Sequence, residues 1–188
     1  MANVNHNTLT DPYLHEPKGA STAAAGNVYV ADGAGSGVWT QAHTYVNGYI
    51  AFDSTTPAYQ HSVTTSFTVI NPTFVLSTSL GWTGLSSPNA RLRYDGTASI
   101  TAGVQICMSF KNNSGTSRDL ELLFRKNGSA LNGGHAITTA VSGEWKTLVL
   151  SDYGPFSTND YLEVFIKGSA AFTLDIAGAN LTVMGVPT

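Results

Sequence analysis

The residues with the most obvious capacity for chemistry are histidines, a cysteine and two close pairs of carboxylates. The histidines are scattered, without an i,i+4 or His-x-His pair: His6, His15, His43, His61 and His135. Metal binding needs ligands that converge and are supported by neighbouring groups, so no metal site is expected. Cys107 lies between Ile106 and Met108, which predicts a buried, inert thiol. A single cysteine also excludes an intramolecular disulfide.

Two carboxylate pairs have the residue types that glycoside hydrolysis requires, Asp119 with Glu121 and Asp160 with Glu163. Both pairs lie at predicted strand starts, near the cations Arg118, Arg125 and Lys167. Surface ion pairs are therefore the favoured interpretation. The chain also lacks a G-x-S-x-G nucleophile elbow. We expect no catalytic residue and no cofactor, and we do not expect an enzyme.

A glycine-rich segment at residues 32–37 follows the apolar residues 28–30 and precedes residues 38–40. Its spacing fits neither of the glycine-rich nucleotide-binding motifs. The extended character of Val38-Trp39-Thr40 argues against a following helix. A hairpin between two short strands is the better interpretation.

The elements that must position these residues are strands, because apolar residues alternate with polar ones and turn residues punctuate the runs. The predicted strands cover residues 66–70, 73–77, 91–95, 99–110, 120–126, 136–141, 145–150, 161–167, 172–176 and 181–184. Asn127-Gly128 is a strong hairpin signal, and a further turn is expected at residues 132–134. No long window has a helical period. The pattern predicts an all-β jelly-roll β-sandwich preceded by an extended N-terminal arm.

Composition limits the possible partners. Only 11% of the 188 residues are charged and the net charge is −3. Residues 1–60 contain one cation and four anions, which accounts for that whole net charge. The chain therefore lacks the positive field that nucleic-acid binding requires. No apolar run approaches the roughly 20 residues of a membrane helix, so neither nucleic acid nor membrane is an expected partner.

Residues 1–44 are predicted to be an arm, and residues 45–188 the globular domain. Asp11-Pro12 and Glu16-Pro17 favour extended backbone and exclude helix around them. Such a segment cannot bury its own apolar groups, so we expect it to dock on a larger neighbour, with aromatic contacts from Tyr13, Tyr29 and Trp39. The alternative left open is that the arm packs back on its own domain.

Two parts of the chain resemble phage proteins. Residues 14–20, LHEPKGA, and residues 28–39, VYVADGAGSGVW, resemble an N-terminal module of tailed-bacteriophage virion proteins. Residues 124–128, 160–167 and 174–183 resemble the trimeric jelly-roll domains of phage decoration proteins and fibres, which are similar to the heads of tumour necrosis factor and complement C1q. The first match is fairly specific, whereas the second is a pattern at the level of the fold.

The resemblance implies a virion structural protein that forms homotrimers and carries no catalytic residues. The leading hypothesis is a capsid decoration (cement) protein on the capsid surface of the virion, with the major capsid protein as partner. The alternative is a tail-fibre or receptor-binding component, attached to a tail protein, for which Trp82 with Asn89 is a weak hint of a glycan site. The predicted anchoring residues are Asp11, Pro12, Tyr13, His15, Pro17, Lys18, Tyr29 and Trp39.

The strand at residues 161–167 suggests a subunit interface. Its alternation places Leu162, Val164 and Ile166 on one face, which we assign to the sandwich interior, and Tyr161 and Phe165 on the other. Because aromatic residues are enriched where subunits meet, Tyr161 and Phe165 are the predicted interface residues. The alternative is an exposed aromatic pair with no partner.

Overall fold

The computed structural model describes residues 27–31, 37–41, 46–53, 59–72, 75–76, 80–85 and 90–187. These residues form strands and connections and contain no helix, as the alternation predicts. No helix capable of crossing a membrane is therefore found among them. The chain divides into two compact units, Met1–Thr44 and Tyr45–Thr188.

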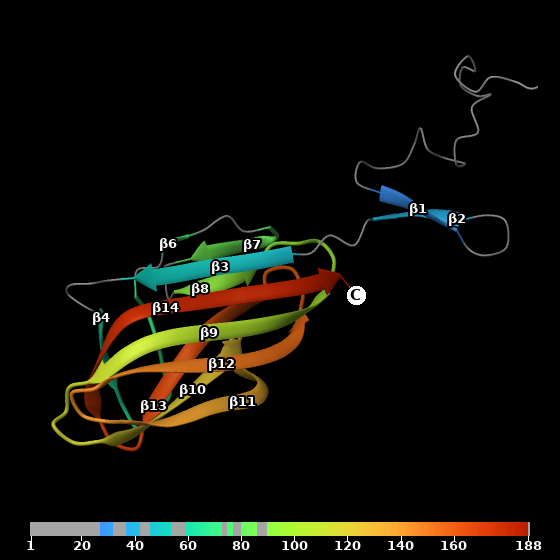
Figure 1. Cartoon of the computed structure of the whole chain (residues 1–188). Coiled ribbons are helices and arrows are strands. Elements are labelled where there is room, and N and C mark those ends of the chain that lie inside the picture. Colours follow the sequence, from blue (N-terminus) through green and yellow to red (C-terminus); the bar gives the residue numbers. More distant parts are fainter. Residues whose placement is uncertain are drawn as a thin grey trace, which may run out of the picture. The chain divides into compact units, whose positions relative to one another are not determined.

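The first unit contains a two-stranded antiparallel hairpin of β1 (Asn27–Ala31) and β2 (Gly37–Gln41) (Figure 1). Tyr29 pairs with Trp39, and Val30 pairs with Val38. The two strands predicted on either side of the glycine-rich segment are therefore confirmed. The connection between them, residues 32–36, lies outside the described residues.

The second unit contains two six-stranded sheets. Sheet I has the order β11 (Ser129–Ala140), β10 (Arg118–Lys126), β13 (Tyr161–Gly168), β8 (Arg91–Tyr94) and β7 (Trp82–Leu85), and β5 (Thr68–Val69) pairs with β13. Sheet II has the order β12 (Trp145–Phe156), β9 (Ile100–Asn112), β14 (Phe172–Pro187), β3 (Val46–Asp53) and β6 (Val75–Leu76), and β4 (Tyr59–Val63) pairs with β14. All these pairs are antiparallel.

The connections make this sandwich a jelly roll. β9 and β12 are neighbours in sheet II, although the hairpin of β10 and β11 between them belongs to sheet I. The chain then returns to sheet I, where β13 pairs with β10, and to sheet II, where β14 pairs with β9. This nesting of strand pairs across two sheets is the Greek-key arrangement of the jelly roll. The predicted fold class is confirmed.

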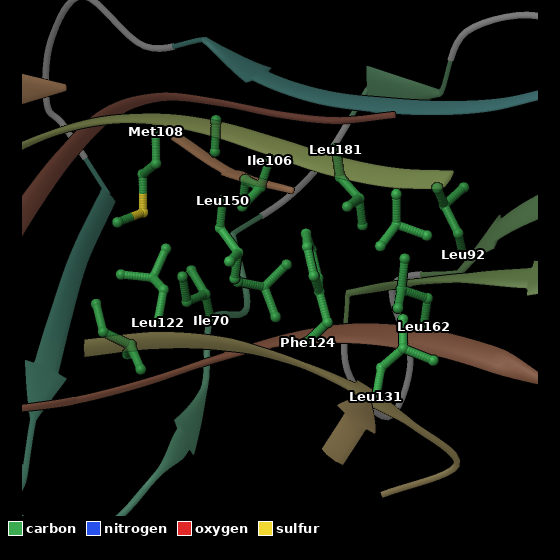
Figure 2. Packing of buried hydrophobic residues seen from close by; sticks show 14 of the residues in the cluster. Ile70, Leu92, Ile106, Met108, Leu122, Phe124, Leu131, Leu150, Leu162 and Leu181 are labelled. Carbon is green, nitrogen blue, oxygen red and sulfur yellow. The ribbon is translucent and has the colours of Figure 1, made fainter. Parts of the chain in front are cut away.

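Alternating burial explains why these residues form strands around one core. Along β9, every second residue from Ile100 to Asn112 is buried, and the residues between them face outward. In β13, Leu162, Val164 and Ile166 are buried, as the alternation predicts. Figure 2 shows Leu162 and Phe124 pointing into the space between the sheets together with Leu181 from sheet II. Burying such side chains stabilises the fold by about 1.5–3 kcal/mol each.

Several predicted element boundaries are wrong. Residues 132–134 do not end a strand: Asn132 and Gly133 have φ of 40° and 76° but lie within β11, and the register with β10 shifts nearby. The strands predicted at residues 172–176 and 181–184 are one strand, β14, with a register shift between Ile176 and Gly178. β5 covers only Thr68–Val69 and is shorter than the predicted strand at residues 66–70. Of the strand predicted at residues 73–77, Val75 and Leu76 are described, and they form β6. The hairpin turn at Asn127-Gly128 is confirmed by positive φ at both residues.

Candidate functional site

A metal site would require several histidine, cysteine or carboxylate side chains to converge. Within the described ranges, no group of three or more histidine, cysteine or carboxylate side chains could hold a metal ion. His61 is buried and hydrogen-bonded to Tyr59 Oη and Thr68 Oγ1, at 3.2 and 3.0 Å. His135 is exposed and contacts Glu121. The remaining histidines (His6, His15 and His43) lie outside the described residues.

Two predictions about polar residues are wrong. Cys107 is half-exposed rather than buried, because it occupies an outward position of β9 between two inward-facing residues, Ile106 and Met108. Glu163 was expected in a surface ion pair, but it is buried. Asp160, the other carboxylate of this predicted pair, accepts a hydrogen bond from Asn127 Nδ2 at 2.6 Å, and Lys126 Nζ lies 3.4 Å from its other oxygen.

The other carboxylate pair shares one hollow on the outer face of sheet I. Asp119 and Glu121 both line a cavity of about 350 Å³. Lys167 Nζ lies 2.8 Å from Glu121 Oε2, and His135 contacts the other oxygen. Burial raises the pKa of Glu121, but hydrogen bonds and charges from Lys167 and His135 outweigh it and lower the pKa overall. A glycosidase acid needs a raised pKa, so Glu121 is not suited to that role.

The predicted interface aromatics lie on this same outer face of sheet I and are covered by cations. The Arg91 guanidinium lies 4.5 Å from the ring centre of Tyr161, and that of Arg125 lies 4.3 Å from the ring centre of Phe165. Both aromatic side chains are half-buried. The outward orientation predicted for them is therefore correct, and their role in an interface stays a prediction.

The outer face of sheet II has a different chemistry. Side chains from β12, β9 and β14 form rows across it, namely Val149–Cys107–Asn180, Ser151–Gln105–Thr182 and Tyr153–Gly103–Met184. None of these residues is charged. Tyr153 is 66% exposed, Met184 60% and Val149 50%. We call these residues the uncharged face.

Charges near the uncharged face lie at its margins. Lys111 and Asp175 form an ion pair of 3.6 Å at one end. Asp152 and Lys146 of β12 approach β11, beside Gly134 and at the Thr139 carbonyl respectively. Asp152 also lines a hollow of about 310 Å³ whose other lining residues belong mostly to the uncharged face, namely Gly103, Gln105, Ser151, Thr182 and Met184. Sequence reasoning missed this face, although the signal was present as a second alternation of Ser, Thr, Gln and Val residues between the core positions of β9 and β12.

The β1–β2 hairpin has apolar side chains on both faces. Val28, Val30 and Val38 alternate with Tyr29 and Trp39 along the two strands, and all three valines are exposed. The rings of Tyr29 and Trp39 meet edge to face, with 5.4 Å between their centres. An isolated two-stranded hairpin is at best marginally stable in water. The other predicted anchoring residues (Asp11, Pro12, Tyr13, His15, Pro17 and Lys18) lie outside the described residues.

The hint of a glycan site at Trp82 is wrong. Trp82 is buried and packs against Tyr94 and Phe156, with ring centres 5.2 and 5.1 Å away. It belongs to the core of the sandwich. Asn89 lies outside the described residues.

The strand pairings define a jelly-roll β-sandwich. Comparisons with known proteins found similar solved structures at low sequence identity. No protein-family model and no curated protein matches the sequence. The PRD1 vertex protein P5 is similar at 14% identity and a TM-score of 0.43, over 76% of this chain and 96% of that one. Murine APRIL is similar at 13% identity and a TM-score of 0.41, over 75% of this chain and 98% of that one. Eiger TNF from S. frugiperda is similar at 13% identity and a TM-score of 0.38, over 76% of this chain and 93% of that one.

Proposed function

We propose that this protein is a capsid decoration protein of a tailed phage, a homotrimer that attaches to the shell through its N-terminal segment. The resemblance of residues 14–20 and 28–39 to a phage virion module motivates this proposal. The observation that carries it is the β1–β2 hairpin, whose two faces both present apolar side chains. A hairpin of this kind gains stability when a neighbouring protein covers one face, because burial removes apolar area from water.

The trimer is proposed to form through the uncharged face of sheet II. Depletion of charge and exposed Tyr and Met side chains are typical of the buried part of a subunit interface. Val149, Tyr153 and Met184 supply the apolar area, and the Ser, Thr and Gln residues supply hydrogen-bonding groups that a partner copy can satisfy. The outer face of sheet I is less suited to this role, because its aromatic residues already lie under arginine side chains.

Attachment only to the assembled shell would stabilise that shell by mass action. Three linked arms raise the effective concentration of each individual contact, so weak contacts suffice. The proposal therefore needs no catalytic residue.

Particles assembled without the protein test this proposal. We expect them to remain infective and to lose resistance to heat or low osmotic strength, and we expect purified protein to restore that resistance. Imaging of intact particles should place the protein on the capsid. Loss of host adsorption with unchanged heat resistance would contradict the decoration role and favour the tail-fibre or receptor-binding alternative.

A further inference from the structure

The hollow on the outer face of sheet I contains groups that the proposed virion role does not use. Asp119 and Glu121 of β10 line it on one side, Ile137 of β11 on another, and Lys167 and Ser169 from the end of β13 complete its rim. Its volume of about 350 Å³ lies at the lower end of the range for small-molecule sites, roughly 300–1,000 Å³.

The strand register explains why these side chains meet. Glu121 is opposite Ile137 in β11 and opposite Lys167 in β13, so the three form one row across the sheet. Asp119 is two residues before Glu121 and so shares its face. The Ser169 backbone N–H donates to the Asp119 carbonyl, and Ser169 Oγ accepts from the Asp119 N–H at 3.1 Å. Sheet pairing therefore fixes the positions of Glu121, Ile137 and Lys167, and the two bonds with Asp119 hold Ser169, which lies in the connection after β13.

The charges in the hollow favour a neutral ligand. Two carboxylates and one ammonium leave a net charge of −1, which disfavours anions. Lys167 neutralises Glu121 at 2.8 Å, so the remaining charge is on Asp119. One Asp119 oxygen accepts a hydrogen bond from Thr139 Oγ1 at 3.0 Å, and Asp119 has no ion-pair partner among the described residues. A single exposed carboxylate beside an ammonium is a weak site for a cation.

The polar and apolar groups suit a polyol. Thr65 also lines the hollow. Asp119 accepts hydrogen bonds, Lys167 donates them, and the hydroxyls of Ser169 and Thr65 do both. Each hydroxyl of a sugar ring can both donate and accept a hydrogen bond, so adjacent hydroxyls can bond to neighbouring donors and acceptors of this kind. Hydrogen bonds to a carboxylate are about twice as strong as those between neutral groups. Ile137, which is 67% exposed, provides an aliphatic surface for the C–H face of the ring. We propose that this hollow binds a neutral monosaccharide unit, a function independent of the attachment to a shell.

Nuclear magnetic resonance titration of the full chain tests this inference. The probes are the methyl glycosides of glucose, galactose and mannose, N-acetylglucosamine, glucuronate as an anion, and Nα-acetyl-lysine methyl ester as a cation. We expect at least one neutral sugar to shift the amides of Asp119, Ile137 and Ser169 with saturation, and glucuronate to bind more weakly than methyl glucoside.

Matched variants localise the binding. Asp119→Asn removes the charge of one hydrogen-bonding group in the hollow, and Thr65→Ala removes the hydroxyl of another. Asp119→Asn should weaken affinity by about tenfold, because a hydrogen bond to a charged group becomes one between neutral groups. Asp95→Asn is the control, because this carboxylate pairs with Arg93 on β8, far along sheet I. It should bind sugar normally.

Three results would overturn the inference. These are an absence of saturable shifts with every neutral sugar up to tens of millimolar, tighter binding of the lysine ester than of any sugar, and sugar binding that both hollow variants leave unchanged. All three are measured on isolated protein, so they leave the shell-attachment experiments unaffected.

Discussion

Cys107 on β9 lies directly opposite Val149 on β12, and both side chains face the outer side of sheet II. Cys107 is the only cysteine in the chain, and Asn180 of β14 flanks it on its other side. The thiol therefore lies within the uncharged face. This position makes it a native reporter of whether that face is covered by another copy.

The first prediction concerns the reactivity of this thiol. In the oligomer, Cys107 should react with a maleimide at least about tenfold more slowly than in guanidinium-unfolded protein, because the partner copy excludes the reagent. Val149→Lys should place a charge in the interface and produce monomers with a fast-reacting thiol. Sedimentation velocity and mass spectrometry of the labelled protein measure both effects.

The control is Leu80→Lys, which changes an exposed leucine outside the uncharged face and should leave the oligomer intact. A native thiol that reacts as fast as an unfolded one in a stable trimer would place the interface elsewhere. Tyr161 and Phe165 on sheet I would then be the next candidates.

The strands could be predicted because burial repeats every second residue. In β14 the same repeat also indicates where the register shifts. Leu174 and Ile176 are buried at even positions, whereas Ala179, Leu181 and Val183 are buried at odd ones. Keeping both sets in the core needs one extra residue, and a β-bulge provides it. The change of phase was read as a break between strands, but it indicates a bulge within a single strand.

The interface residues were harder to predict, because the alternation of side chains along a strand shows only that the strand has two faces. It does not show which groups from other strands lie beside the outward-facing residues. Tyr161 and Phe165 were chosen as outward-facing aromatics. The cations that cover them are Arg91 and Arg125. These arginines are distant from β13 in sequence and lie beside it only because β13 pairs with β8 and β10. The uncharged face likewise joins three strands that are far apart along the chain. Such a surface can be recognised only once the order of strands in the sheet is known.

The second prediction concerns pH. Burial lowers the pKa of His61, so the folded state favours the neutral ring, and a proton binds the unfolded chain first as the pH falls below about 6.5. Stability should therefore be full above about pH 6.5 and decrease as the pH falls towards the folded pKa. The slope should be at most about 1.4 kcal/mol per pH unit, the limit for one proton.

His61→Gln tests the assignment, because glutamine retains a group that can bond to Thr68 and does not titrate in this range. Urea unfolding between pH 7.5 and about pH 5 should give a flatter dependence for this variant. Glu121, Asp160 and Asp175 have lowered pKa values, so their contribution is lost at lower pH, below about 4.5. Equal slopes for variant and parent would show that another group is responsible.

The third prediction concerns the core. Val164→Asp should destabilise the domain by more than about 4 kcal/mol, because it places an unpaired carboxylate among buried side chains of sheet I. Circular dichroism melting and soluble yield measure the effect. Thr173→Asp on β14 is the control, since this position is exposed and should melt close to the parent. A normal melt for Val164→Asp would mean that β13 has the opposite register.

The last prediction concerns the hairpin. Tyr29 and Trp39 pack edge to face on adjacent strands, so Tyr29→Ala with Trp39→Ala should remove most of the apolar area that this face offers to a shell protein. We expect co-sedimentation with capsids to fall by more than tenfold, since a loss of about 1.4 kcal/mol at each contact is multiplied across three linked arms. Trimer mass and melting temperature should stay unchanged, because neither residue belongs to the Tyr45–Thr188 unit. Phe67→Ala removes a comparable aromatic side chain from that unit and should bind capsids normally. Equal losses for both variants would assign attachment to the jelly roll rather than to the hairpin.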